Sequence, residues 1–428
     1  MALLIGITIG AGIYSTPQII AGYLGSFSVI ITLWIIVGVF VFLGGFVYAE
    51  LGTRLPNTGG EYVYISRCFG PYAGFMFGWT QFIIIRTSAA AGLAIITADY
   101  LGNFVELKGI AHTTVALSVI FVLGLLNYVG IQRASAFQKV SSILKISGLF
   151  ILVGLGLFLI KGHENLLATH APPTGGLGPV GNTVAALMLI VFAHTGWDRV
   201  GYVAEEMKNP RRVVPLTMFI GVSIIVITYV LTNMIYHRTL GIEGMRGSTV
   251  VASDVATQLI GPVGAGFIAF LVVISTTGSI NGTMMTATRA YYAMAKDGLF
   301  FKWLNFVHPK FQTPSRAILA HCLWAAAILL IRGKFETIAS GMVFAVLIFY
   351  AFSTVALFKL RKKSARSRDS YCVPLYPFLP GLYLAGILTL LVLRAIFEWE
   401  RSLVDLAFIA TGFPFSLIWL RRAKRIGQ

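Results

Sequence analysis

Two glycines and a proline interrupt the first apolar segment of the chain, which contains "ITIGAGIYSTP". An interior glycine costs a helix about 1 kcal/mol relative to alanine, and an interior proline costs about 3 kcal/mol. A break in a helix frees N–H groups, which attract an anion, and C=O groups, which attract a cation. A zwitterionic α-amino acid carries both charges a short distance apart. The backbone around Gly10, Ala11 and Gly12 is therefore a candidate site for such a molecule, since glycine permits close approach.

A second interruption of this kind occurs in "VAALMLIVFAHTGWDRVGYVAEEMKNP". Apolar residues lead to Phe192, and His194, Thr195 and Gly196 then break the pattern before a helix resumes. Irregular backbone inside a membrane is tolerated only where it lines a cavity or is buried in protein. Two interrupted helices in corresponding positions indicate an inverted-repeat transporter. The alternative is that the glycines serve helix packing, but packing leaves the regular separation of the two breaks unexplained.

Long apolar helices must position these breaks. The chain has 428 residues, of which 57% are hydrophobic and 11% are charged. Apolar runs recur that reach or approach the roughly 20 residues needed to cross a bilayer. The runs are continuous rather than alternating, which excludes a transmembrane barrel. The sequence therefore predicts an all-α polytopic membrane protein. About twelve spans are expected, near residues 2–22, 27–50, 72–101, 112–130, 136–160, 181–205, 214–237, 264–296, 315–331, 337–360, 379–396 and 403–420.

The net charge of +17 indicates topology rather than nucleic-acid binding. Basic residues concentrate in one set of alternating loops and in the C-terminal "RRAKR". This asymmetry follows the positive-inside rule and predicts that both termini are cytoplasmic. We expect an integral protein of the plasma (inner) membrane, whose partners are the lipid bilayer and a small molecule. The loop "KDGLFFKWLNFVHPKFQTPSR" mixes aromatic and charged residues and is expected to lie against the membrane.

Residue patterns typical of enzymes or metal sites are lacking in the sequence. Cys68, Cys322 and Cys372 lie far apart and form no CxxC pair. No phosphate-binding loop and no metal-ligand spacing is present. We therefore expect no cofactor, no metal and no enzymatic activity.

Three segments carry a resemblance to a known family: "GAGIYSTP", "FAHTGWDRVGYVAEEMKNPRRVVP" and "STTGSINGTMMTATRAYYAMAKDGLF". They resemble the first, sixth and eighth spans of transporters in the amino acid–polyamine–organocation (APC) superfamily. The chain is most similar to the L-amino-acid transporter (LAT) type and its bacterial relatives, over essentially its whole length. The resemblance implies a LeuT-type 5+5 inverted repeat with broken helices 1 and 6. The repeats would be residues 1–160 and 181–360, followed by two further spans and a cytoplasmic C-terminus in 361–428.

The resemblance also assigns roles to the first break. The amides of Ala11 and Gly12 would hold the carboxylate of an amino acid, and Gly10 would complete the turn. Carbonyl groups around Thr8 and Ile9, together with those of the second break, would hold the ammonium group.

At the second break, the resemblance implies that the carbonyls of Phe192 and Thr195 contribute to the ammonium site. Phe192 would also form an aromatic lid on the outer side, and Ala193, His194 and Thr195 would border the side-chain pocket. The alternative for His194 is a packed or hydrogen-bonded histidine. Many relatives carry glycine at the position of Thr195, so the threonine narrows the pocket and favours small neutral amino acids. Tyr350, on the tenth span, is a second candidate for closing the outer side.

Lys145 lies about 14 Å inside the fifth span, at 1.5 Å per helical residue. A charge at such depth costs at least about 2.5–3.5 kcal/mol and usually marks function. In sodium-coupled relatives an ion bridges spans one and eight, and in sodium-independent members a lysine can occupy that place. Lys145 matches this lysine, with carbonyls near Gly10 and the hydroxyls of Ser275 and Thr276 as its expected partners. A purely structural lysine is the alternative.

Two further buried charges have less definite roles. Arg86, in "FIIIRTSAAAG", faces the substrate path or pairs with an acidic residue. Asp198 is expected to face away from the pocket, which disfavours a cationic substrate.

The resulting hypothesis is a transporter of small neutral L-amino acids that works by alternating access, most simply as a sodium-independent exchanger. The alternatives are a proton-coupled or cationic amino acid/polyamine antiporter and a non-transporting amino-acid sensor. Eukaryotic LAT-type proteins can attach to a single-span partner through a cysteine in an outer loop. No cysteine lies in the predicted outer loops, so no obligatory subunit is expected.

Overall fold

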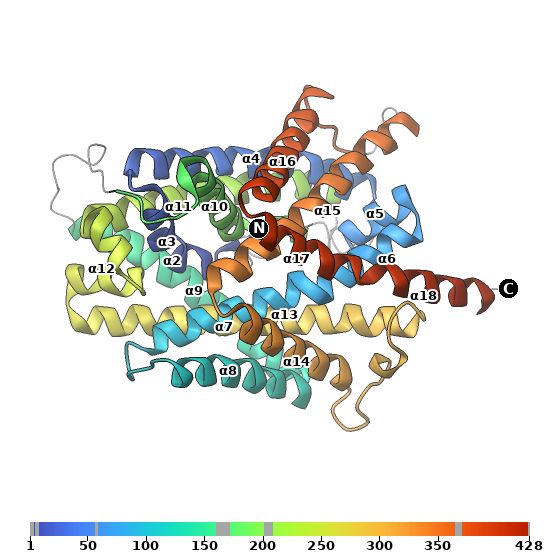
Figure 1. Ribbon diagram of the computed structural model, residues 1–428, viewed down its shortest axis with the longest axis horizontal. Helices are drawn as coiled ribbons and strands as arrows, with labels where there is room; N and C mark the ends of the chain where they lie inside the picture. Colours follow the sequence, from blue (N-terminus) through green and yellow to red (C-terminus); the bar gives the residue numbers. More distant parts are fainter. Residues whose placement is uncertain are drawn as a thin grey trace.

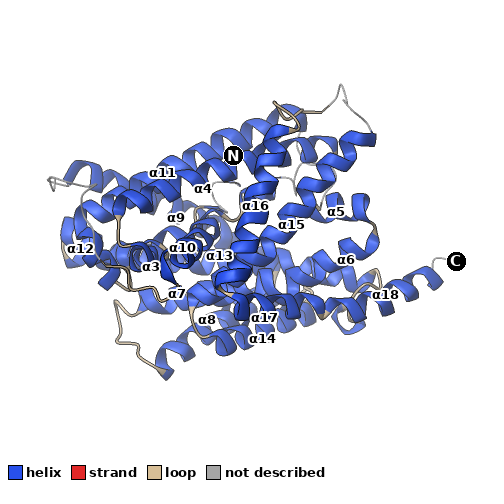
Figure 2. Ribbon diagram, turned by 45° about the horizontal axis from the view of Figure 1, so that its top comes forward, coloured by secondary structure: helices blue, strands red, loops and turns tan. Residues whose placement is uncertain are grey.

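The computed structural model describes residues 4, 8–55, 59–159, 172–200, 209–363 and 370–426, which form helices joined by short turns (Figure 2). The first half comprises α2 (Gly12–Ser15), α3 (Pro17–Leu24), α4 (Phe27–Arg54), α5 (Glu61–Phe69), α6 (Pro71–Thr80), η1 (Gln81–Ile85), α7 (Arg86–Leu101), α8 (Ile110–Val129) and α9 (Ile131–Leu159). The second half comprises α10 (Gly178–His194), α11 (Pro210–Gly247), α12 (Val251–Ile260), α13 (Pro262–Lys296), η3 (Lys302–Leu304), α14 (Ser315–Arg332), α15 (Phe335–Lys363), α16 (Phe378–Phe397), α17 (Trp399–Ala410) and α18 (Gly412–Ile426).

Within the described residues, 11 helical segments are long and apolar enough to cross a membrane. The predicted first span lies partly outside the described residues, and its described part is divided between α2 and α3. The predicted seventh span ends a few residues before Gly241, where a φ of 67° kinks α11 before it continues to Gly247. Polar residues there carry the helix beyond the apolar run, so hydropathy alone does not locate its end.

Several long helices, among them α4, α8, α11 and α13, run roughly parallel to one another, and α15 and α16 cross them obliquely (Figure 1). Helices α4 and α11 lie along one side of the molecule, and α8 and α14 lie along the opposite side. The breaks in the first and sixth spans fall between these two walls. This arrangement surrounds the irregular backbone with protein, as its presence in a membrane requires.

The order of elements repeats along the chain. A short helix, α5, follows α4, and a short helix, α12, follows α11. Each is followed by a Gly-Pro pair that begins the next long helix, and Gly70 and Gly261 both have positive φ, at 90° and 78°. Figures 1 and 2 place α5 and α12 at opposite ends of the molecule. Similar elements in opposite directions are the arrangement expected of inverted repeats.

Candidate functional site

Both predicted interruptions begin where the sequence places them, and the helix predicted to resume after the second one falls on residues 201–208, outside the described part of the chain. Residues 9–11 are non-helical, and α2 begins at Gly12. Helix α10 ends at His194, Thr195 is extended, and Gly196 has a φ of 111°. Only glycine adopts this φ without strain, so Gly196 fixes where the second break turns.

The two breaks are in direct contact. A Cβ atom placed on Gly12 would lie 2.6 Å from the Cα atom and 2.9 Å from the Cβ atom of Ala193. The obstruction includes backbone, which cannot rotate away. Glycine at position 12 is therefore required for the observed approach of the first break to the second.

Tyr229 of α11 joins the two breaks through its hydroxyl group. The hydroxyl oxygen lies 2.9 Å from the carbonyl oxygen of Thr8 and 3.1 Å from that of Ala193. The tyrosine is completely buried, and Trp34 of α4 packs edge-on against its ring at 5.6 Å. The sequence does not distinguish Tyr229, because a single tyrosine in an apolar span is common. Its role depends on which helices face it.

A cavity of about 100 Å³ lies where the breaks meet. The first break contributes Thr8, Gly10, Ala11 and Gly12, and the second contributes Phe192, Ala193, Thr195 and Gly196. The other walls include Ile85, Arg86, Ala89, Leu93, Arg199, Ser279, Thr283 and Met342. The structure thus brings together most of the residues proposed from sequence to contact an amino acid.

Ile9 and His194 are not among the residues that line this cavity. Ile9 is fully buried in the hydrophobic core. The imidazole of His194 has its Nδ1 atom 2.9 Å from the carbonyl oxygen of Ile190, and its ring packs near Trp34 and Tyr229. For His194, the structure therefore favours the alternative of a packed, hydrogen-bonded histidine over a pocket residue.

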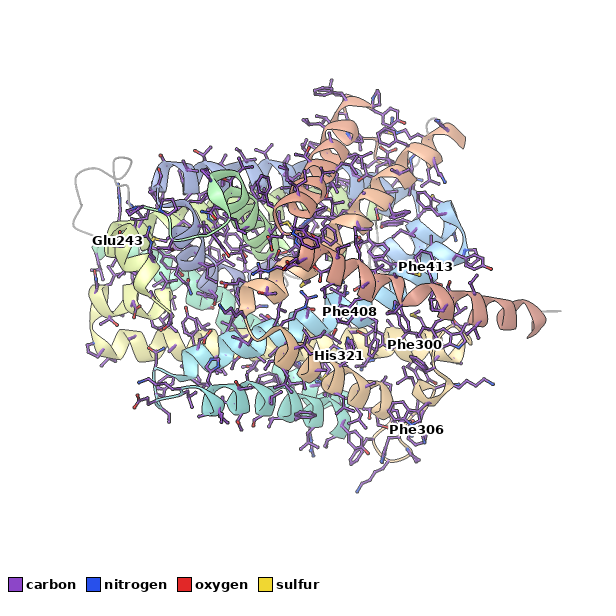
Figure 3. The ribbon with its side chains drawn as sticks, in the orientation of Figure 1. Glu243, Phe300, Phe306, His321, Phe408 and Phe413 are labelled. Carbon is purple, nitrogen blue, oxygen red and sulfur yellow. The ribbon has the colours of Figure 1, made fainter. Side chains whose placement is uncertain are left out.

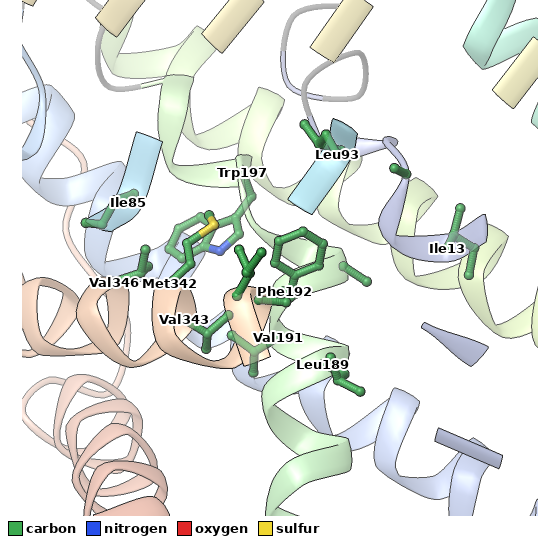
Figure 4. Close-up of a cluster of buried hydrophobic side chains, with 14 of the residues drawn as sticks. Ile13, Ile85, Leu93, Leu189, Val191, Phe192, Trp197, Met342, Val343 and Val346 are labelled. Atoms are coloured by element: carbon green, nitrogen blue, oxygen red, sulfur yellow. The ribbon is translucent and has the colours of Figure 1, made fainter. Parts of the chain in front are cut away.

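Phe192 closes one side of the cavity. Its ring packs edge-on against Phe335, at 5.2 Å between centroids, and is 8% exposed. Figure 4 shows it in one apolar cluster with Leu93 of α7 and Met342 of α15. This placement fits an aromatic lid.

Tyr350 does not lie with this lid. It is about 22 Å further along α15 than Phe335, at 1.5 Å per residue. Its hydroxyl lies 3.2 Å from Oδ1 of Asp198, and its ring packs against Trp197 and Tyr48. The expectation that Tyr350 closes the outer side beside Phe192 is therefore corrected, because the length of the helix separates the two positions.

A second polar cluster lies beneath the cavity, toward α5. Asp198 and Glu61 are both buried, and the hydroxyl of Tyr48 lies 2.6 Å from Oε1 of Glu61. Nε of Arg199 lies 3.4 Å from Oδ2 of Asp198. A small gap of about 10 Å³ lies within this cluster. Asp198 lines that gap and not the main cavity, in line with the expectation that it faces away from the pocket.

Arg86 lines the main cavity and begins α7 directly after the π-helical turn η1. Such turns are rare and occur often at functional sites. Nε of Arg86 donates a hydrogen bond to Oε1 of Gln81 at 2.9 Å, and no acidic residue of the described chain forms an ion pair with it. Arg86 also borders an adjoining cavity of about 270 Å³. Of the two alternatives, the geometry favours the substrate path.

The packing of α9 on α13 locates Lys145. A Cβ atom on Gly278 would collide with Ser141, and one on Gly148 would meet Leu271. The two helices therefore run antiparallel with these residues face to face. Lys145 is one turn after Ser141, so it faces α13 about one turn before Gly278.

Ser275 occupies that position on α13. Lys145 is 2% exposed, and Ser275 is fully buried with no hydrogen-bond partner for its hydroxyl within the described residues. The neighbouring Thr276 is already engaged, with its hydroxyl 2.7 Å from that of Thr97 and donating to the carbonyl of Val273. Within the described residues no hydrogen bond joins Lys145 to Ser275, so the predicted contact is not formed there. The Ser275 hydroxyl has no partner, whereas that of Thr276 is engaged, so Ser275 is the better placed of the two to accept a bond from the ammonium group of Lys145.

Metal-binding clusters are not found: no group of three or more histidine, cysteine, aspartate or glutamate residues in the described ranges could hold an ion. The three cysteines are free thiols. The functional groups at the site are accordingly backbone amides and carbonyls, hydroxyls and the two arginines.

A family model for amino acid permeases matches residues 1–413. The chain belongs to the amino acid permease family. The permease is 29% identical over 389 residues to the serine/threonine exchanger SteT of Bacillus subtilis, covering 90% of this chain and 87% of that protein. It is 28% identical to the human cystine/glutamate transporter over 434 residues, covering 99% and 85% of the two chains. It is also 28% identical to the human Asc-type amino acid transporter 1 over 431 residues, covering 99% and 82%.

These relatives are all transporters or exchangers. The permease is therefore an amino acid transporter of the APC superfamily and LAT type, an integral membrane protein and not an enzyme. In this permease the cavity between the two broken helices is the candidate substrate site.

Proposed function

We propose that this permease exchanges small neutral L-amino acids across the membrane by alternating access, without sodium. The observation that carries the proposal is the cavity of about 100 Å³ between the two broken helices. An engineered cavity of about 150 Å³ holds one benzene molecule. The smaller cavity here fits an amino acid with a short side chain better than an aromatic one, and serine and threonine are named for one relative.

In this proposal, the amides of Ala11 and Gly12 hold the carboxylate, and carbonyls of both breaks hold the ammonium. The carbonyl oxygen of Phe192 already accepts bonds from the hydroxyl and amide of Thr195, at 2.7 and 3.0 Å. We therefore assign Phe192 to shaping the break and forming the lid. The carbonyls of Ile9 and Thr195 remain as acceptors for the ammonium, and that of Thr8, which already accepts from Tyr229, would take the ammonium as a second donor.

Lys145 would make the sodium ion unnecessary. Its burial opposite Ser275 supports a role in which its ammonium tethers the fifth span to the eighth and, through carbonyls near Gly10, to the first. A buried positive charge disfavours a cation in the same place by direct repulsion. Transport would then proceed at the same rate in sodium-free buffer.

Alternating access would involve two gates. The contact of Phe192 with Phe335 closes one side of the cavity. On the other side, the adjoining cavity of about 270 Å³ extends from Arg86 to Tyr62 and Asp297. We propose that this second cavity is the route to the cytoplasm, with both termini on the cytoplasmic side of the plasma membrane. The repeated order of elements supports residues 1–160 and 181–360 as the two inverted repeats, with 361–428 following them as an addition. We propose no obligatory subunit.

A second candidate substrate is an amino acid with an acidic side chain. Arg86 carries the observation that favours it, because its charge borders the cavity and one relative is named a cystine/glutamate transporter. Arginine binds carboxylates in a bidentate manner. If the acidic substrate is the true one, an Arg86→Gln variant should lose glutamate uptake and keep serine uptake. If the neutral substrate is the true one, the variant should change the uptake of both amino acids by similar factors.

The experiment that tests the proposal is uptake by purified permease in liposomes of labelled alanine, serine, leucine, glutamate and arginine. The expected order places alanine and serine above leucine, with little uptake of glutamate or arginine. Preferential uptake of glutamate would favour the second candidate. Preferential uptake of arginine would contradict both.

A further inference from the structure

Helices α8 and α14 lie on the outside of the helix assembly (Figures 1 and 2). A groove between them lies away from the transport path. Its volume is about 430 Å³. It is lined by Phe121, Gly124, Leu125, Tyr128, Phe306, His308, Ser315, Arg316, Ile318, Leu319 and Cys322. None of these residues borders the cavity between the broken helices.

The floor of the groove lies where α8 carries Gly124. A Cβ atom on Gly124 would collide with the sulfur of Cys322, so the two helices touch there and form the floor. The side chains of Leu125 and Leu319 flank the groove and are 61% and 46% exposed. From Ser315 to Cys322 the groove is about 10 Å long. In a membrane, these apolar walls face hydrocarbon and fit a lipid acyl chain.

Positive charge gathers at the mouth of the groove. The guanidinium group of Arg316 lies 4.1 Å from the ring centroid of Phe306, and Lys310 is exposed nearby in the same loop. Figure 3 shows Phe306 at the lower edge of the molecule. In the ranges that the structure describes, neither Arg316 nor Lys310 forms an ion pair with an acidic residue. Their charge is thus available to an external anion.

The loop at the mouth has a defined conformation. The hydroxyl of Thr313 donates to the carbonyl of Tyr128, at 2.8 Å, and fastens the loop to the end of α8. Nδ1 of His308 accepts hydrogen bonds from the amides of Lys310 and Phe311, at 3.2 and 3.3 Å. Because Nδ1 is an acceptor, the ring proton of neutral His308 is on Nε2, which can donate to a ligand.

We propose that this groove binds one anionic phospholipid. An acyl chain lies between α8 and α14, and the phosphate group meets Arg316, Lys310 and Nε2 of His308. A phosphate ester supplies several acceptor oxygens to the guanidinium. A zwitterionic lipid would bring its own cation to a mouth that is already positive, so an anionic headgroup fits better.

Native mass spectrometry of the purified permease in a mixture of phosphatidylglycerol and phosphatidylcholine tests the proposal. We expect wild-type protein to retain phosphatidylglycerol preferentially. Arg316→Gln should retain about fivefold less phosphatidylglycerol than the wild type. This factor corresponds to the contribution of one basic residue at an anionic membrane surface, about 1 kcal/mol. The control Lys139→Gln removes an exposed lysine of α9 outside the groove and should retain lipid like the wild type.

A second variant tests the groove without altering charge. Leu319→Trp should fill the acyl site and reduce retained phosphatidylglycerol while leaving Arg316 in place. Equal retention by Arg316→Gln and Lys139→Gln, or equal retention of the two lipids by wild type, would overturn the proposal. Displacement of the lipid by millimolar glycerol phosphate would also overturn it, since a soluble phosphate site would then suffice.

Discussion

The hydroxyl group of Tyr229 provides the sharpest test of the proposed site. It lies 2.9 Å from the carbonyl oxygen of Thr8 and 3.1 Å from that of Ala193. A single hydroxyl proton is shared between two acceptors, one on each broken helix. Tyr229→Phe removes this link and keeps the ring and its packing against Trp34.

The expected cost follows from the burial of the acceptors. A hydrogen bond contributes about 0.5–1.5 kcal/mol net, and a buried acceptor left without a partner costs about 1–3 kcal/mol. We expect a loss of about 1–2 kcal/mol in holding the two breaks together. That loss corresponds to about a 5- to 30-fold change in an equilibrium constant. We expect to observe it as a higher KM for serine uptake.

Tyr236 provides a matched control on the same helix. It is also fully buried, and its hydroxyl has no hydrogen-bond partner in the part of the chain that the structure describes. Tyr236→Phe should therefore leave transport within about twofold of wild type, because no bond is lost. The assay is the concentration dependence of serine uptake into proteoliposomes, with matched amounts of folded protein. Equal KM values for Tyr229→Phe and Tyr236→Phe would refute the reasoning.

Three further substitutions follow from the same geometry. Gly12→Ala should strongly impair uptake, because the added methyl meets the α10 backbone at 2.6 Å at a cost of about 1–3 kcal/mol. The control Gly45→Ala should transport normally, because its added methyl would lie 3.9 Å from the nearest atom. Equal loss of uptake in the two variants would contradict the close contact of Gly12 with α10. Lys145→Ala should lower uptake at least about tenfold in sodium-free buffer while Lys139→Ala does not, and stimulation of the wild type by a sodium gradient would argue against the role of Lys145. Thr195→Gly should raise leucine uptake relative to serine by about tenfold, and an unchanged substrate ranking would show that Thr195 does not set pocket size.

Much of the architecture follows from local sequence signals. Apolar runs predict the membrane helices, and the glycines at positions 12 and 196 predict where two of them break, because helix propensity and hydropathy are properties of neighbouring residues. The orientation of His194 could not be predicted in this way. Its ring direction depends on Trp34 and Tyr229, which belong to helices distant in sequence.

Arg86 and Tyr229 show the same limit within the site. Arg86 enters the cavity after a π-helical turn, which the apolar pattern of its span does not reveal. Tyr229 bonds to both breaks only because α11 faces them. The Gly-Pro pairs at Gly70 and Gly261 stand in the sequence itself, and their corresponding places in the two halves are a local signal of the repeat.

Counterflow in proteoliposomes tests the central claim most directly. Vesicles that contain purified permease are loaded with unlabelled serine or left empty, and uptake of labelled serine is measured in sodium-free buffer. Rapid uptake into loaded vesicles and little into empty ones is the predicted result for sodium-independent exchange. Serine uptake that is absent from loaded vesicles until sodium is added would contradict the account.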